Sequence, residues 1–202
     1  AAGQGLNSAV IQLVNKIKMT KPQALDLRNK AGKTPLHFAV TCDWKGVIKT
    51  LLDGGANPII VDNLGNTALH EAIQRKLIVE IIIDIIEATK AQSIHVLGHT
   101  EPSVGLSGQL SLDRCSKRDS TLELLKLRNN NGRTALSHAL YYRRKEISRI
   151  LLDRGADPTS TDIGGNTALH LAISHNLILP TIFHIIDAAG MRSLRQDEIM
   201  EQ

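Results

Sequence analysis

The chain has 202 residues, a length that allows one or two compact domains. Apolar residues make up 42% and charged residues 22% of the chain, a balance that argues against a disordered protein. The formal net charge of +4 permits an acidic partner without requiring one, and aromatic residues, at 2%, leave little on which nucleobases could stack.

The number of cysteines and the length of the apolar runs indicate the cellular compartment and whether a segment crosses a membrane. Two cysteines, Cys42 and Cys115, are too few for a disulfide framework and favour a reducing, cytoplasmic compartment. The longest apolar stretch, residues 77–88, contains Glu80 and Asp84 and is shorter than the roughly 20 residues that a membrane-spanning helix needs. We expect no membrane segment. The first residues lack the pattern of a signal peptide, and without an initiator Met the chain is expected to be a processed form or an excised piece.

The first predicted element in chain order is a helix over residues 6–18. Its apolar side chains recur at helical spacing and form one stripe. These residues are Leu6, Val10, Leu13, Val14 and Ile17. We expect this helix to close the N-terminal face of the elements that follow.

A short phrase then recurs four times. The residues at 32–37, Gly-Lys-Thr-Pro-Leu-His, return with small changes at 65–70, 132–137 and 165–170, so the glycines are spaced by 33, 67 and 33 residues. An ungapped comparison of 25–88 with 125–188 finds 30 identities in 64 positions, which indicates a duplicated block. A period of 33 residues is typical of stacked repeats.

Each copy predicts a turn, a helix, a second turn and a second helix. The Asn or Asp that precedes each glycine begins a turn in which glycine adopts positive φ, and the following Thr caps the next helix. In the first copy, Pro35 fits the first helical position, and Gly55 ends the second helix. Because neither helix can bury its apolar stripe alone, neighbouring copies must stack.

The pattern G-x-T-P-L-H-x-A, followed by L-L-x-x-G-A-x-P, resembles the ankyrin repeat. The resemblance implies an all-α solenoid within a single domain, 1–202, that binds proteins. Four clear helix-turn-helix repeats match it, at about 29–61, 62–94, 129–161 and 162–190. The chain departs from the family pattern at Ser137, where His is expected, and at the turns between helices, which lack the usual Gly-His.

Two segments fall outside these repeats. Residues 92–124 are predicted to form an irregular insertion that returns through a helix near 120–126, because Pro102 and several Gly and Ser residues favour a loop. A degenerate middle repeat stays open, since residues 98–100 repeat the Gly-x-Thr of 65–67 after 33 residues. The charged tail, 191–202, predicts a short capping helix. The apolar residues at 178–186 need such a cover, unless the natural protein continues beyond 202.

The recurring histidines are the first candidates for chemistry. In ankyrin repeats, which this chain resembles, the residue at the position of His37, His70 and His170 is structural and bonds the Thr of its own turn and the neighbouring loop. Packed helices lie about 8–10 Å apart, whereas zinc needs its nitrogen ligands at about 2.0–2.1 Å. We therefore predict no metal site, and interpret His138 as a local compensation for Ser137.

Other signatures of chemistry are missing from the sequence. The Gly and Ser residues at 105–108 lack the G-x-S-x-G spacing of a nucleophile elbow, and neither of the usual glycine-rich phosphate motifs occurs. Basic residues near 114–128 and 143–149 are interleaved with acidic ones, which argues against nucleic-acid binding. The sequence predicts no enzyme, no cofactor, no small-molecule substrate and no nucleic-acid partner.

The resemblance places partner contacts on the turn tips and on the ends of the first helices. Tyr and Arg are enriched at binding hot spots, although Tyr141 and Tyr142 could instead cover the helix end, and Trp44 could serve packing alone. The predicted partner-binding residues are Lys30, Lys33, Thr41, Trp44, Asn63, Gln74, Arg75, Asn130, Asn131, Arg133, Tyr141, Tyr142 and His175.

Three hypotheses about function follow. The first is a non-enzymatic module that binds an acidic or mixed-polarity protein through its concave face. The second is the targeting segment of a larger multidomain protein, such as a secreted bacterial effector acting in the host cytosol or nucleus. The third, an inhibitor-like regulator of transcription factors as in the NF-κB inhibitor group, ranks below these two because a positive chain suits a basic ligand poorly, and an enzyme ranks fourth.

Overall fold

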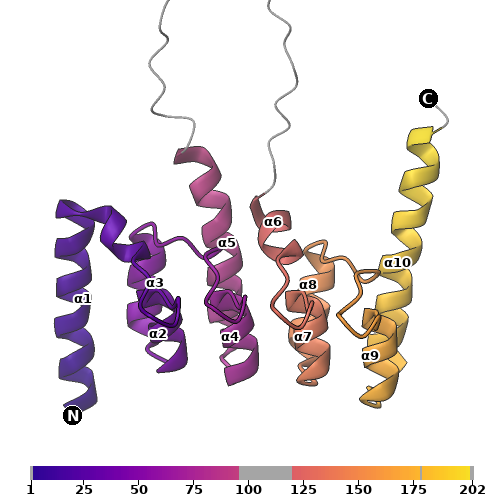
Figure 1. The fold of residues 1–202 in the computed structure, drawn as a ribbon, viewed down its shortest axis with the longest axis horizontal. Helices are drawn as coiled ribbons and strands as arrows, with labels where there is room; N and C mark the ends of the chain where they lie inside the picture. The colour runs from indigo at the N-terminus through magenta and orange to yellow at the C-terminus, as the bar shows by residue number, and fades with distance from the viewer. Residues whose placement is uncertain (1, 96–119, 178, 201–202) are drawn as a thin grey trace, which may run out of the picture.

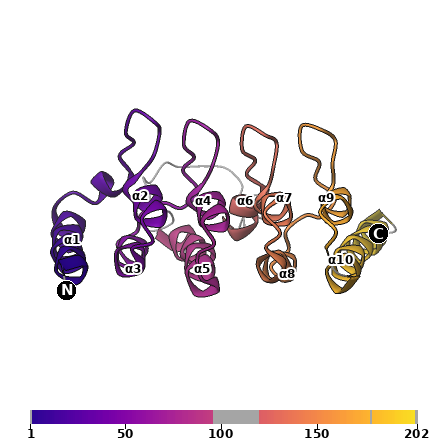
Figure 2. The same cartoon turned by 90° about the horizontal axis from the view of Figure 1, so that it is seen from below.

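The computed structural model describes residues 2–95, 120–177 and 179–200. Every regular element within these ranges is a helix, so the predicted all-α fold is confirmed. The helices stand in one row, and their connecting hairpin loops project to the same side (Figures 1 and 2). The repeats therefore form a solenoid with a helical body and a row of hairpin tips.

The row begins with helix α1 (Ala2–Thr20), which is longer than the helix predicted over 6–18, and with the 3₁₀-helix η1 (Pro22–Asp26). Four helix pairs follow in the part of the chain that the structure describes. They are α2 (Pro35–Thr41) with α3 (Lys45–Asp53), α4 (Ala68–Arg75) with α5 (Val79–His95), α7 (Ala135–Tyr141) with α8 (Lys145–Asp153), and α9 (Ala168–Ser174) with α10 (Leu179–Met200).

Threonine begins the first helix of every pair. The hydroxyl oxygens of Thr34, Thr67, Thr134 and Thr167 accept a hydrogen bond from the backbone N–H three residues later. Such a cap is worth about 1 kcal/mol. Because the cap is a local interaction, the sequence alone predicts where these helices start.

The turns between paired helices use a residue with positive φ where the family pattern has glycine. These residues are Asp43, Lys76, Arg143 and Asn176, with φ between 51° and 61°. The left-handed conformation costs an ordinary residue about 1–2 kcal/mol. The same turn geometry is thus kept in every pair without its usual glycine.

The helices pack in two layers. The first helices of the pairs form an inner layer in which α2 contacts α4, α4 contacts α7, and α7 contacts α9. In the outer layer, α1 packs against α3, α3 against α5, and α8 against α10. Small alanines at the equivalent positions 39, 72, 139 and 172 are buried, which lets the helices approach closely.

The core is aliphatic. Leucines at 36, 69 and 136 and isoleucines at 48, 82 and 85 are at most 1% exposed, and the buried side chains join into one continuous cluster. Fully burying such a side chain stabilises the fold by about 1.5–3 kcal/mol. Stacking therefore supplies stability that a single helix pair lacks.

Helix α6 (Ser120–Lys126) enters between the second and third pairs, where it packs against α5 and touches α7 (Figure 2). Residues 92–95 of the predicted insertion 92–124 belong to α5. Residues 96–119 lie outside the described residues, so the structure does not decide between a loop and a degenerate repeat there. The described part of the tail predicted over 191–202 is helical, as the last part of α10, which runs without a break to Met200; its role as a cap stays a prediction.

Candidate functional site

The hairpin tips are built by Asn and Asp side chains. The Asp62 carboxylate accepts from the N–H groups of Leu64 and Asn66 at 2.9 and 2.8 Å, and Asn29, Asn129 and Asp162 bond their own turns in the same way. Glycine then follows with positive φ. Each tip is thus a rigid turn rather than a flexible loop.

Several predicted contact residues at the tips bind a neighbouring hairpin. The side-chain amide of Asn63 donates to the Lys30 carbonyl at 2.9 Å, and that of Asn130 donates to the Asn63 carbonyl at 3.1 Å. The Asn131 carbonyl accepts from the Ile163 N–H at 3.2 Å. These asparagines hold the tips in register, and their contact with a partner stays a prediction.

The structural role that the resemblance implies for histidine is found in the first two repeats. Nε2 of His37 lies 3.0 Å from the Asn66 carbonyl, and Nε2 of His70 lies 3.1 Å from the Arg133 carbonyl. Because a carbonyl only accepts, Nε2 carries the proton and Nδ1 accepts from the Thr N–H of the same turn. Burial lowers the pKa of His37 and lowers that of His70 to about 4, so both rings are neutral.

The third repeat breaks this chain of histidines. Ser137 keeps the bond to Thr134, with its N–H 3.3 Å from the hydroxyl oxygen, but no bond to the next hairpin is found among the described residues. His138, one residue later, is 4% exposed and lies edge-on to His70, with ring centroids 5.3 Å apart. His138 does not replace the missing bond to the next hairpin, because both of its ring nitrogens are buried without a hydrogen-bond partner, so its interpretation as a compensation for Ser137 finds no support in these contacts.

Aromatic rings continue from His138 across the inner layer. The centroids are separated by 4.8 Å from His138 to Tyr142, 5.3 Å from Tyr142 to Tyr141, and 5.2 Å from Tyr141 to His175. The Arg133 guanidinium carbon lies 3.6 Å from the centroid of the Tyr141 ring, within the range of a cation–π contact. We call His138, Tyr142, Tyr141, His175 and Arg133 the aromatic row.

The aromatic row unites four of the predicted contact residues, and it presents Tyr141 with 39% of its surface exposed. Sequence reasoning missed His138 as a member. The sequence did contain a signal for it, because the family pattern expects His at position 137 and the chain has His one position later, at 138. Burial, His70 and Arg133 together lower the pKa of His138 to about 3, so the His138 ring is neutral near neutral pH.

Charged side chains gather beside the row. The Glu71 carboxylate lies 3.4 Å from Lys33 Nζ and 3.2 Å from Arg75 Nε, and it accepts from the Thr41 hydroxyl at 3.2 Å. Its side chain is 9% exposed, against 50% for Arg75. The buried Glu71 carboxylate orients the more exposed cations of Lys33 and Arg75, so this part of the surface presents positive charge to a binding partner.

Two predicted contact residues lie elsewhere. Trp44 is half-buried against the core and lines an apolar groove of about 460 Å³ between α1 and α2, which it shares with Phe38 and Leu27. Gln74 is exposed at the end of α4, and its carbonyl accepts from Arg144 at 3.3 Å. The predicted residues therefore form a face with several parts rather than one cluster.

Side chains that could hold a metal ion do not converge in the described ranges. No three His, Cys, Asp or Glu residues there are arranged as metal ligands. None of the described helices combines the length and the apolar character that crossing a bilayer requires. The arrangement offers recognition by rings, cations and amides.

Known proteins resemble this chain in both sequence and fold. The family model described as "Ankyrin repeats (3 copies)" matches residues 1–92 and 114–186. A crystal structure of the ankyrin repeat domain of Bcl-3, titled a unique member of the IkappaB protein family, superposes with a TM-score of 0.64 and 27% identity over 92% of this chain and 68% of that one.

Several curated proteins are similar to this chain in sequence. Human B-cell lymphoma 3 protein is 32% identical over 87% of this chain, chicken nuclear factor NF-kappa-B p105 subunit is 32% identical over 82%, and human NF-kappa-B inhibitor epsilon is 28% identical over 75%. The chain spans 32%, 17% and 26% of the lengths of these relatives. The match of the family model to most of the sequence shows that the chain belongs to the ankyrin repeat family.

Proposed function

We propose that the chain is a non-enzymatic protein-binding module that regulates an NF-κB-type transcription factor by binding it. The observation that carries the proposal is the aromatic row, where Tyr141 is exposed on a rigid scaffold under the Arg133 guanidinium. Large rings held in place lose little entropy on binding, which makes them effective anchors.

The transcription-factor assignment draws on the relatives. One of them is named as an inhibitor of NF-κB, and the Bcl-3 domain is titled a member of the IkappaB family. The regulator hypothesis, ranked third from the sequence, therefore becomes the leading one. The relatives named here give no support to the effector hypothesis. A regulator of this kind would act in the cytoplasm or the nucleus.

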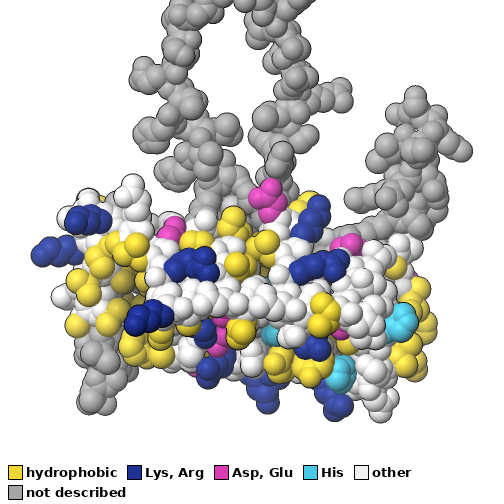
Figure 3. Space-filling model, in the orientation of Figure 1, with side chains coloured by type: hydrophobic (Ala, Val, Ile, Leu, Met, Phe, Trp, Pro, Cys, Tyr) yellow, Lys and Arg dark blue, Asp and Glu magenta, His cyan; other side chains and the backbone are white. Residues whose placement is uncertain are grey.

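Charge favours an acidic stretch on the partner. Arg75 and Lys33 are more exposed than the Glu71 carboxylate between them, and the Arg133 side chain, at 18% exposed, covers Asp162 at 5%. Figure 3 shows Lys and Arg as the more prominent charged groups on the face that carries the hairpins. Complementary charge accelerates association and fixes the register of the partner.

The test measures binding to a purified NF-κB dimer by biolayer interferometry. Replacing Tyr141 and Tyr142 together with alanine is expected to weaken binding more than tenfold, since truncating a hot-spot residue costs about 2 kcal/mol or more. The matched control replaces the exposed Phe183 and Ile186 of α10 with alanine and is expected to leave binding unchanged.

Circular dichroism checks that the double variant keeps its helicity. If it does not, the single change Tyr141→Ala, at the more exposed ring, decides the question. A wild-type chain that fails to bind the dimer would overturn the NF-κB assignment. Unchanged affinity in the tyrosine variants would instead overturn the assignment of this face.

A further inference from the structure

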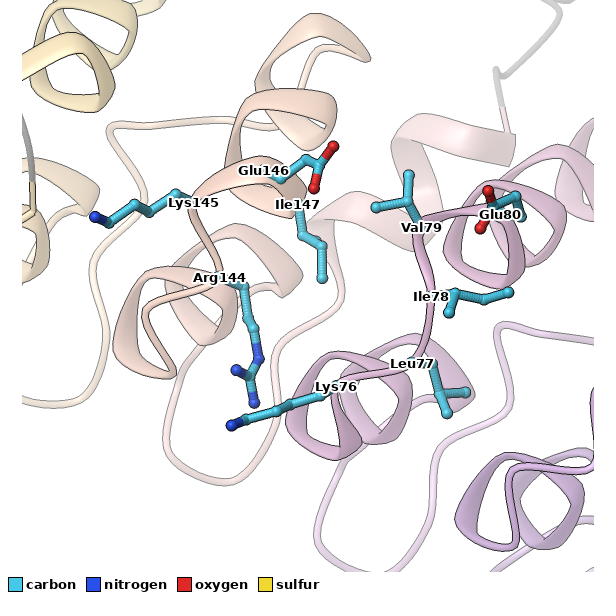
Figure 4. Close-up of a pocket in the computed structure, with 9 residues that line it drawn as sticks. All are labelled: Lys76, Leu77, Ile78, Val79, Glu80, Arg144, Lys145, Glu146 and Ile147. Atoms are coloured by element: carbon cyan, nitrogen blue, oxygen red, sulfur yellow. The ribbon is translucent and has the colours of Figure 1, made fainter.

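The outer layer of the stack is interrupted at one point. Helix α3 packs against α5, and α8 packs against α10, but α5 and α8 are not among the closely packed pairs, because α6 lies against α5 and α7 instead. A cleft of about 490 Å³ opens between the starts of α5 and α8, lined by residues 76–80 and 144–147 (Figure 4). Its volume lies within the roughly 300–1,000 Å³ of ligand-binding pockets.

The cleft combines apolar side chains on both of its sides with a cationic end. Figure 4 shows Val79 of α5 and Ile147 of α8 facing each other across it, with the Lys76 and Arg144 side chains extending toward one another at one end. Arg144 is fixed there, because its guanidinium donates to the Ile73 carbonyl at 3.1 Å and to the Gln74 carbonyl at 3.3 Å. The cationic end is thus preorganised.

The positive charge of this end is not balanced locally. Within the described ranges, the ion pairs use Lys33, Arg75, Arg133, Arg154 and His184, and none of them includes Lys76, Arg144 or Lys145. The two carboxylates that line the cleft, Glu80 and Glu146, lie away from the converging tips of Lys76 and Arg144 (Figure 4). An anionic group from outside would therefore meet two cations at this end without competition from these carboxylates.

We propose that this cleft docks an acidic peptide segment of a partner protein. An aliphatic side chain of the segment enters between Val79 and Ile147, and its carboxylates meet Lys76 and Arg144. The two apolar walls favour a peptide over inorganic phosphate or a nucleic-acid backbone, which carry no aliphatic anchor. The site is separate from the aromatic row and does not depend on the proposed function.

The test uses a fluorescein-labelled peptide in which one leucine is flanked on each side by three glutamates. Fluorescence anisotropy follows its binding to the full chain at low salt. Lys76→Glu is expected to weaken binding at least fivefold. The matched control Lys49→Glu changes the net charge equally on the exposed surface of α3 and is expected to leave the affinity within twofold of wild type, as is Tyr141→Ala.

Two further probes separate the contributions. A peptide with serine in place of leucine is expected to bind at least fivefold more weakly, and single-stranded DNA is expected not to displace the leucine peptide. Absent binding, equal losses in the two lysine variants, equal affinity for the serine peptide, or displacement by DNA would each overturn the proposal. The affinity of the Lys76→Glu variant for the NF-κB dimer is a separate readout, so this proposal can fail while the proposed function stands.

Discussion

Replacing His70 with alanine removes a buried side chain that ties the second repeat to the third. Nε2 of His70 donates to the Arg133 carbonyl at 3.1 Å, its Nδ1 accepts from the Thr67 N–H at 3.3 Å, and its ring is fully buried. His170 makes the same contact with Thr167 at 3.4 Å but is exposed, and no carbonyl of a following repeat faces it in the described chain. Comparing His70→Ala with His170→Ala therefore isolates the contribution that the bond between repeats makes to the stability of the fold.

The expected magnitudes follow from these contacts. His170→Ala loses a local capping interaction worth about 1 kcal/mol. His70→Ala loses the same interaction and also leaves a carbonyl without its donor, which costs about 1–3 kcal/mol. It further loses the ring contact with His138 at 5.3 Å. We expect His70→Ala to destabilise the fold by about 2 kcal/mol more than His170→Ala.

Equilibrium unfolding in urea, followed by circular dichroism at 222 nm, measures both variants against wild type. The native spectra of the variants should match, so that only the midpoints differ. Equal losses of stability would refute the reasoning, because the bond between repeats would then contribute nothing measurable. A larger loss in His170→Ala would refute it more strongly.

The remaining predictions concern pH and the hairpin glycines. Burial lowers the pKa of His70 to about 4, so the stability that this ring contributes is complete above pH 6.5 and is lost as the pH falls toward 4. The loss of stability between pH 7 and pH 5, measured by urea unfolding, should therefore be about 2 kcal/mol smaller in His70→Gln than in wild type. Gly65→Ala should lower the melting temperature more than Gly165→Ala. Both glycines have φ near +75°, but a Cβ at Gly65 would lie 2.9 Å from the Asn130 backbone nitrogen, whereas nothing lies within 4 Å at Gly165. Equal shifts in a thermal scan would contradict the close approach.

The parts of the fold that sequence reasoning anticipated are those decided by short-range chemistry. A Thr hydroxyl bonds an N–H three residues away, and a turn Asn or Asp bonds N–H groups two and four residues away, so a recurring phrase carries its own local structure. The register of the repeats predicts the contacts between copies, because equivalent residues in neighbouring copies lie next to each other in the stack. The resemblance to the ankyrin repeat puts Tyr141 and His175 at equivalent helix ends, and their rings lie 5.2 Å apart.

The parts that it missed depend on contacts outside the repeat. The fourth repeat was predicted to end at about residue 190, yet α10 continues through Gly190 to Met200, although glycine inside a helix costs about 1 kcal/mol. The cleft between α5 and α8 depends on where α6 lies, and no periodic signal specifies that place. The stacking of Arg133 on Tyr141 likewise joins a hairpin to a helix end, which spacing alone does not predict.

Hydroxyl-radical footprinting of the chain with and without an NF-κB dimer tests the central claim most directly, because it reports the solvent exposure of individual side chains. We predict that oxidation of Tyr141 falls several-fold in the complex, while oxidation of Phe183, which is 59% exposed on α10, does not change. Protection of Phe183 with Tyr141 still fully reactive would contradict the account.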